Sequence, residues 1–358
     1  MSTIIEQPYT SDLNQEWQNF LNNDVLADKV IGNSANNTRA PICGDLYIST
    51  KTKIAYLNTK IDLYNVFWKI KILDYHIPKE GIIKKQMKFS SISPEELDVI
   101  NNYVQTEKIV DEHIITQIIN PNGRIKYKDV RKISVGLSKK DINSVRTKKK
   151  SAFYNCFVVI MRILWKGAFK EIHIKVFNTG KMEIPGIQDD ECLFKALNNL
   201  TDMLRPICQD NALKYIKDKI ETVLINSNFN CGFYINRDIL FHLLKYEYKI
   251  NCSYDPCSYP GIQCEFYYNI NQPELHLEPQ TGNKFVHKEQ IKVSFMIFRT
   301  GSVLIVGKCS DEILIEIFQY IKKILSDKYN EINVGLTRHV KCKKKTKIRK
   351  KKMTRLVT

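Results

Sequence analysis

The sequence contains one segment twice: IKVFNTGKMEIPG at Ile174–Gly186 and FMIFRTGSVLIVG at Phe295–Gly307. The two copies align without a gap, and each places Phe-x-Thr-Gly between two apolar stretches. This pattern is typical of a β-hairpin, because glycine adopts at low cost the positive φ that such turns require. The sequence therefore predicts a duplicated hairpin.

A helix is predicted after each hairpin. The acidic starts Asp189–Glu191 and Ser310–Glu312 suit the N-terminus of a helix, where they cap free N–H groups and complement the dipole. Large apolar residues follow at spacings of three and four, which place them on one helix face. They are Leu193, Leu197, Leu200 and Leu204 in the first helix, and Leu314, Ile317, Phe318, Ile321 and Leu325 in the second. Both helices are expected to cover a sheet.

The order of elements before the hairpins also repeats. A strand, a helix and a further strand are predicted at 46–56, 61–72 and 153–164, and again at 222–231, 236–246 and 260–268. The predicted fold class is α+β, with an antiparallel sheet and helices on one side. The opposite face is left uncovered, which a soluble protein tolerates when that face has a partner.

The repeats predict a division of the chain. We expect a mobile arm over 1–40, a first repeat over 41–205, a second repeat over 206–330 and a basic tail over 331–358. The first repeat carries an insert at about 74–150. Within the insert, Ser93–Glu96 begins a short helix and 125–137 has strand character.

The charge of the chain favours a polyanionic partner. Lys and Arg number 55 against 38 Asp and Glu, for a net charge of +17. Nucleic acid is the leading candidate, because each neutralised phosphate releases a counterion. Eleven basic residues lie after residue 337, without an acid, which leaves about +6 for the rest. This tail is a localisation signal, a sequence-independent clamp on DNA, or a solvated end with no specific role.

The cysteines and histidines do not form a recognisable site. The ten cysteines contain no CxxC pair and no histidine at zinc-finger spacing, and the densest group, Cys252, Cys257 and Cys264, is irregular. We expect free thiols, and neither a metal nor a cofactor. The seven histidines are scattered, and no phosphate-cradling loop, nucleophile elbow or paired-carboxylate motif is found. The sequence predicts a non-enzymatic protein.

Two features of the sequence bear on localisation. The first residues lack the basic flank and apolar stretch of a signal peptide, and no apolar run approaches about 18 residues. The protein is therefore expected to be soluble and intracellular, with no membrane partner.

A family resemblance rests on several motifs in a fixed order. They are Val158–Ile163, the Phe-x-Thr-Gly-Lys-Met of the first hairpin with its closing Gly186, Tyr254-Asp255-Pro256, and Tyr259-Pro260-Gly261. In this order and duplicated, they resemble the TATA-box-binding protein family over about 45–73 and 151–326. A divergent form with a large insert is similar to the copies carried by large nucleocytoplasmic DNA viruses. That similarity implies a nucleus or a cytoplasmic viral factory as the location, with packaging in the virion as a further option.

The resemblance implies a saddle. Its concave sheet would lie in the minor groove of A·T-rich promoter DNA and its convex helices would face other transcription factors. Members of the family kink the duplex with phenylalanine wedges. The second wedge of each half aligns with Phe177 and Phe298. The first aligns with Tyr259 in the second half and with Cys156 in the first, where a bulge would bring the adjacent Phe157 into place.

Further DNA contacts follow from the same alignment. An asparagine donor suits the acceptors on the groove floor, and Asn226 or Asn228 takes this place in the second half. The equivalent first-half stretch offers Thr50 and Thr52. Positions that touch bases become Met296, Leu304 and Val306 in the second half, but Lys175, Glu183 and Pro185 in the first. The second half is thus expected to be the more competent for DNA.

The remaining site predictions concern charged residues. Arg162 and Lys181 match positions that approach phosphates. Their second-half counterparts, Glu265 and Ser302, have lost the positive charge. Asp255 matches an acidic residue that contacts the B-type general transcription factor, and Cys257 replaces a second acid. Ordinary core packing for each aromatic residue and a solvated surface for each polar one remain open alternatives.

Two functions remain open at this point. The first is a transcription initiation factor that binds and bends promoter DNA and recruits the RNA polymerase machinery. The second is a saddle-shaped assembly subunit of an initiation complex with weak or no DNA binding of its own, which Cys156, Glu183 and Pro185 favour. Either would be a monomer or part of a heteromeric complex.

Overall fold

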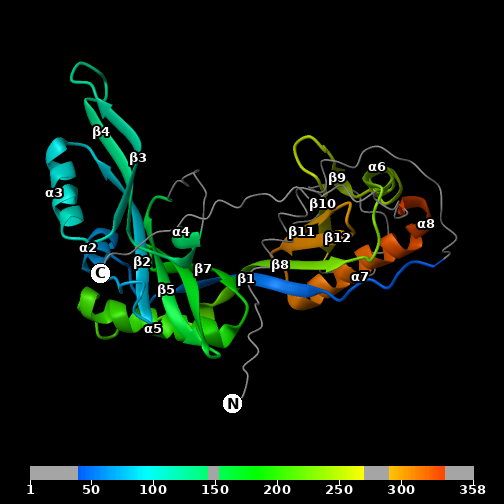
Figure 1. Cartoon of the computed structure of the whole chain (residues 1–358), viewed down its shortest axis with the longest axis horizontal. Helices are drawn as coiled ribbons and strands as arrows, with labels where there is room; N and C mark the ends of the chain where they lie inside the picture. Colours follow the sequence, from blue (N-terminus) through cyan, green and yellow to red (C-terminus); the bar gives the residue numbers. More distant parts are fainter. Residues whose placement is uncertain (1–38, 144–152, 270–289, 335–358) are drawn as a thin grey trace, which may run out of the picture. The chain divides into compact units, whose positions relative to one another are not determined.

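The computed structural model describes residues 39–143, 153–269 and 290–334 (Figure 1). Most of the predicted arm, most of the predicted tail and the basic run Arg146–Lys150 lie outside these residues. No helix in the described ranges is long and apolar enough to cross a membrane.

The described chain divides into two compact units. One contains residues 50–143 and 153–223 and is called here the insert-bearing unit. The other contains 39–49, 224–269 and 290–334 and is called the second-repeat unit. The divisions fall inside β1 (Tyr47–Tyr56) and inside β8 (Glu221–Asn230), at the first strand of each repeat.

The insert-bearing unit consists of an antiparallel sheet with helices. After β1 come α2 (Leu63–Lys69), β2 (Gly81–Ser91), α3 (Pro94–Gln105), β3 (Val110–Ile119), β4 (Tyr127–Gly136), α4 (Lys139–Asn143), β5 (Cys156–Trp165), β6 (Ala168–Phe177), β7 (Lys181–Ile187), α5 (Asp190–Cys208) and a short 3-10 turn over Lys217–Lys219. The hydrogen-bonded order is β3-β4-β2-β5-β6-β7-β1.

The second-repeat unit is smaller. After β8 come α6 (Arg237–His242), which continues as a π-helical turn over Leu243–Glu247, then β9 (Asn251–Ser253), β10 (Ile262–Asn269), β11 (Gln290–Ile297), β12 (Ser302–Gly307), α7 (Asp311–Asp327) and α8 (Tyr329–Ile332). The order of its strands is β8-β12-β11-β10-β9.

The two units share one arrangement of four strands. The order β5-β6-β7-β1 in one unit corresponds to β10-β11-β12-β8 in the other. A helix follows the first strand in each unit, α2 or α6, and another follows the hairpin, α5 or α7. The predicted α+β class and the predicted duplication are confirmed.

The two hairpin turns are equivalent in detail. Gly180 has φ 82° and Gly301 has φ 81°. The N–H of Gly180 donates to the carbonyl of Phe177 at 2.9 Å, and the N–H of Gly301 donates to the carbonyl of Phe298 at 3.0 Å. Both glycines therefore occupy the left-handed region that the sequence pattern indicated.

Each turn is also held against the loop that follows the first strand of its repeat. The carbonyl of Gly180 accepts from the N–H of Leu57 at 2.8 Å, and the carbonyl of Gly301 accepts from the N–H of Cys231 at 2.9 Å. A Cβ on either glycine would lie 2.3 Å from a backbone oxygen, that of Thr59 or of Phe233. No side chain fits there without moving backbone.

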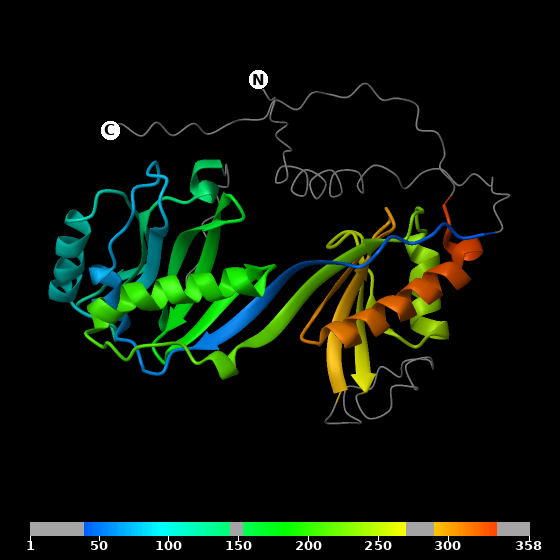
Figure 2. The same cartoon turned by 90° about the horizontal axis from the view of Figure 1, so that it is seen from below.

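The helices after the hairpins begin and pack as predicted. The Asp189 side chain accepts from the N–H of Glu191 at 3.0 Å, and the Ser310 hydroxyl accepts from the N–H of Ile313 at 3.4 Å. All nine apolar residues predicted to face a sheet are buried. Each contributes about 1.5–3 kcal/mol through removal of its side chain from water. Figure 2 shows α5 (green) and α7 (orange), each along one side of its own unit's strands.

The insert adds three strands and two helices, α3 and α4, to its unit. As predicted, a helix begins after Ser93, whose hydroxyl accepts from the N–H of Glu96 at 3.3 Å. The Glu96 carboxylate accepts in turn from the N–H of Ile92, the residue before the N-cap, at 2.8 Å. The strand predicted at 125–137 is β4. The insert is therefore a continuation of the sheet beyond β5.

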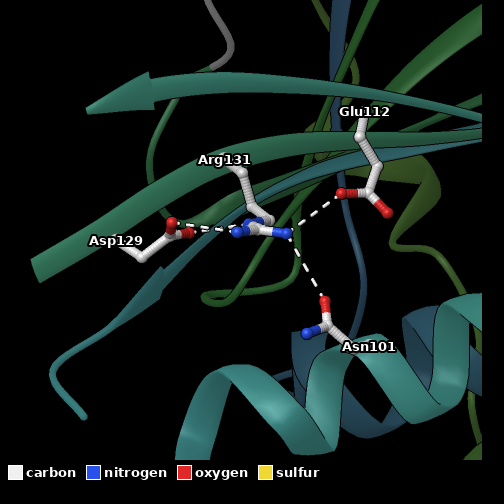
Figure 3. A network of polar contacts seen from close by, with 4 residues as sticks. All are labelled: Asn101, Glu112, Asp129 and Arg131. Carbon is white, nitrogen blue, oxygen red and sulfur yellow. Dashed lines mark hydrogen bonds and ion pairs between the residues drawn. The ribbon is translucent and has the colours of Figure 1, made fainter. Parts of the chain in front are cut away.

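A buried ionic network fixes α3 to these added strands (Figure 3). The Arg131 guanidinium donates to both carboxylate oxygens of Asp129, at 2.7 and 2.9 Å, and to Glu112 at 3.0 Å. A further contact reaches the side-chain oxygen of Asn101 on α3 at 3.4 Å. The hydrogen bonds to Asp129 raise the pKa of Arg131, because they stabilise the charged guanidinium.

The turn glycines provide a test of the fold. We expect Gly180→Ala to lower the free energy of unfolding by about 2–4 kcal/mol, because a positive φ and a backbone clash both oppose the added Cβ. Gly167→Ala is the matched control, since Gly167 has φ 79° but no heavy atom within 4 Å of an added Cβ. Its cost is expected to be about 1 kcal/mol. Urea denaturation of both variants measures the difference, and equal losses would contradict the clash.

Candidate nucleic-acid interface

Burial alternates along the strands of the second-repeat unit and separates two faces. On β8, Ile225, Ser227 and Phe229 are buried, whereas Asn226 and Asn228 point to the opposite side and are half-buried. The buried residues Ile225 and Phe229 pack in one core with α7, so the asparagines lie on the face without helices. That side is called here the helix-free face.

Strand register gathers most of the second-half predictions on this face. Asn228 pairs with Leu304, which pairs with Met296. In the next row Asn226 pairs with Val306. Directly paired residues in an antiparallel ladder point to the same side. The structure therefore brings together the five second-half residues predicted to meet the bases of the groove floor.

Phe298 and Tyr259 form an aromatic pair beside these rows. Their ring centroids are 5.9 Å apart at an interplanar angle of 57°, and the Tyr259 hydroxyl lies 3.5 Å from the Met296 sulfur. Phe298 is only 1% exposed, because Tyr259 and the backbone of Gly261 cover it. Burial also raises the pKa of Tyr259. The two predicted wedges lie together, but the Phe298 ring is enclosed rather than presented.

The first-half aromatics take different positions. Phe177 is half-buried at the end of β6 and lies opposite Cys156. The β5–β6 register is continuous from Cys156 to Trp165, without the bulge that we expected. Phe157 consequently points into the helix-side core, with 0% exposure. The structure therefore does not bring Phe157 to the face opposite α5, where a wedge would have to lie.

The charges expected near Phe177 are paired. Glu183 and Lys175 are direct partners across β6 and β7, and their side chains form an ion pair at 2.6 Å. The Lys181 ammonium lies 5.9 Å from the centroid of the Phe177 ring. Thr50 and Thr52 are half-buried on β1, where the β1–β7 register shifts between Lys51 and Lys53. The negative charge of Glu183 is thus offset by the neighbouring Lys175.

Arg162 is engaged by the insert. Its guanidinium donates to the carbonyl of Ile77 at 2.9 Å and stacks 4.5 Å from the centroid of the Tyr75 ring. The residue is 5% exposed. A guanidinium held in this way does not point at a phosphate, so the predicted phosphate contact of Arg162 does not agree with its position.

Further insert residues, including those of α4, cover the same end of the insert-bearing unit's face opposite α5. Lys84 on β2 forms an ion pair with Asp141 on α4 at 2.8 Å, and the N–H of Lys139 donates to Glu171 on β6 at 2.9 Å. Burial here lowers the pKa of His173, which keeps that imidazole neutral near pH 7. The first-half face is therefore partly closed by the chain's own insert.

Two exposed aromatics were missed by sequence reasoning. Phe153 and Tyr154 precede β5 and are 64% and 62% exposed. The Lys175 ammonium lies 4.8 Å from the centroid of the Phe153 ring, and the Lys88 ammonium 3.4 Å from that of Tyr154. The signal in the sequence was two adjacent aromatic residues shortly after a basic run. The sequence pattern had placed these two aromatics at the start of a strand.

Asp255 lies in an exposed loop between β9 and β10. Its carboxylate accepts from the Ser258 hydroxyl at 2.6 Å and from the N–H of Cys257 at 3.0 Å. These hydrogen bonds, with that from Ser258 the strongest, lower the pKa of Asp255 and keep it ionised. The loop presents a fixed negative charge at the surface.

The cysteines and acids of the described ranges form no cluster of three or more His, Cys, Asp or Glu that could hold a metal ion. The nine cysteines in these ranges are free thiols.

The role of Arg162 can be tested by stability. We expect Arg162→Met to lower the free energy of unfolding by about 1–3 kcal/mol, because a hydrogen bond to Ile77 and a cation–π contact to Tyr75 are lost while the aliphatic stem is kept. Arg124→Met, at an exposed loop position, serves as the control and should stay within about 0.5 kcal/mol. Thermal melts that show equal stability for the two variants would contradict this assignment.

The chain is similar in sequence to a known protein and in structure to solved proteins. No protein-family model matches the sequence. A TATA-box-binding protein-like protein of Acanthamoeba polyphaga mimivirus is 22% identical over 315 residues, which cover 72% of this chain and 82% of that protein. A structure described as Methanococcus jannaschii TBP has a TM-score of 0.39 and 16% identity, and covers 80% of this chain and 99% of that one. The predicted resemblance to TATA-box-binding proteins, in a viral form, is confirmed by the mimivirus relative.

Proposed function

We propose that the protein is a transcription initiation factor that binds duplex DNA through the minor groove, bends it, and recruits the transcription machinery. It does so without catalytic activity, at the site of viral transcription, in the nucleus or in a cytoplasmic factory. The similarity to a TATA-box-binding protein-like protein of a large DNA virus supports this role.

One observation carries the proposal. Asn226, Asn228, Leu304, Val306 and Met296 lie in adjacent rows on the helix-free face of the second-repeat unit. The minor groove of A·T pairs offers only acceptors, which an asparagine amide can contact as a donor, and flat apolar side chains fit its floor. These five uncharged side chains favour groove contact over contact with phosphates alone. The charged residues Glu265 and Lys292 on the same face form an ion pair with each other.

Recruitment is assigned to the Asp255 loop and to the helix side of each unit. The Asp255 carboxylate, held ionised in its loop, is the proposed contact with a B-type general transcription factor. The helix side of each unit would face the polymerase machinery.

Bending gives a direct test. A duplex bearing an A·T-rich site, with a donor and an acceptor fluorophore at its two ends, is titrated with the protein. We expect the end-to-end distance to shorten on binding, because wedge insertion unstacks base steps and kinks the duplex. Binding without any change in energy transfer would contradict the bending, and the absence of binding would contradict the whole proposal.

A single substitution tests which face meets DNA. We expect Leu304→Glu to weaken DNA binding at least about tenfold, or about 1.4 kcal/mol, because it places a carboxylate between Asn228 and Met296 where phosphates repel it. Ile315→Glu on α7 makes the same change at a residue that is 52% exposed on the helix side. In fluorescence anisotropy titrations, this control should bind DNA with the affinity of the unmodified protein. Equal effects of the two substitutions would overturn the assignment of the face.

A second candidate function is an assembly subunit with weak DNA binding of its own. The engagement of Arg162 by the insert and the partial closure of the first-half face favour it. Selection of DNA from a random pool, with and without a B-type factor, separates the two functions. Enrichment of A·T-rich sites by the protein alone favours the first, whereas enrichment only with the factor favours the second.

A further inference from the structure

The strands of the insert extend the face of their unit opposite α5 with lysines. On β2 and β4, Met87 and Ile133 point into the helix-side core, so the direct pair Lys88 and Lys132 points to the opposite side. Lys128 has the same parity on β4 as Lys132 and points the same way. The insert therefore adds a basic surface beyond β5.

The two exposed aromatics lie over this surface. The Lys88 ammonium covers the Tyr154 ring at 3.4 Å, and the hydrogen bond from Lys88, together with the charges of Lys88 and Lys128, lowers the pKa of the Tyr154 hydroxyl. Phe153 lies over Lys175, which stands on β6 two residues before Phe177. We call Lys88, Lys128, Lys132, Phe153, Tyr154 and Lys175 the insert patch.

The acids of this face neutralise only part of the patch. Glu183 is paired with Lys175, and Asp141 is paired with Lys84, which is outside the patch. Asp111 on β3 is the direct partner of Ser134 and belongs to the same side. A positive excess remains around Lys88 and Lys128, and it is continuous with the face that carries Phe177.

We propose that the insert patch binds the phosphate backbone of duplex DNA, outside the base pairs that the proposed minor-groove site contacts. This inference rests on the proposed function and adds a second contact, which lengthens the footprint on DNA. Lysine ammonium groups bind phosphates as point charges. Because lysines already occupy positions over the Phe153 and Tyr154 rings, these rings hold the ammonium groups in place rather than offering open faces for stacking with unpaired bases.

The test compares two duplexes that share one bound site. The first contains only the site, and the second extends it by a helical turn or more on both sides. We expect Lys88→Gln/Lys128→Gln to weaken binding to the long duplex about tenfold and to lower the slope of log affinity against log salt by about 2, since each lost phosphate contact removes about 0.9. Binding to the short duplex should not change.

Controls separate charge from folding. Lys69→Gln/Lys323→Gln removes two exposed lysines from α2 and α7, on the helix sides, and should leave both affinities unchanged. Lys88→Arg/Lys128→Arg keeps the charge and should bind the long duplex as the unmodified protein does. Melting temperatures of all variants monitor folding, and loss of affinity by the arginine variant would overturn a charge-based contact.

The remaining outcomes distinguish the two proposals. If the glutamine variant binds the long duplex as tightly as the unmodified protein, the insert patch is overturned and the proposed function stands. If the unmodified protein binds neither duplex, both are overturned. If Tyr154→Ala loses affinity for single-stranded DNA but not for the long duplex, the patch binds single strands and the assignment to a duplex is wrong.

Discussion

The separation of two faces by the strands governs the rest of the molecule. In each unit, alternate residues of four shared strands pack beneath a long helix, α5 or α7, and the others lie on the opposite side, which α4 covers in part in the insert-bearing unit. The backbone hydrogen bonds that seat Gly180 and Gly301 against the loops after β1 and β8 fix where this alternation begins. A shift of one residue would exchange the faces, because side chains alternate with a period of two. The candidate interface therefore depends on register as much as on residue type.

The insert changes one copy of this arrangement without disturbing its core. It adds β2, β4 and β3 at one edge and secures them through charges, since Asp129 is fully buried beside Arg131, and Lys85 is buried against Glu107 at 2.6 Å. Burial lowers the pKa of Lys85, and the ion pair with Glu107 opposes that shift. Buried pairs of this kind are sensitive to the loss of one partner, because the other is left uncompensated. The duplicated domain thus has two halves with different surfaces.

Much of the fold could be predicted from the sequence, but only part of the candidate site. The hairpins, the caps at Asp189 and Ser310 and the apolar stripes are local patterns, and the structure confirms them. The grouping of Asn228, Leu304 and Met296 followed from alternation and alignment. The side of the sheet on which Phe157 lies could not be predicted in this way. It depends on a β5–β6 register without a bulge, which the sequence does not display. The engagement of Arg162 by Ile77 joins residues 85 positions apart, and nothing local indicates such a partner.

If the protein binds DNA as proposed, the enclosed ring of Phe298 has a kinetic consequence. Tyr259 and the backbone at Gly261 seal it, and a Cβ on Gly261 would lie 2.8 Å from the ring. A base step that is to receive this ring must wait for the 259–261 segment to open. The rate of association with DNA would then be limited by this opening. It would stay below the rate that electrostatic steering alone permits.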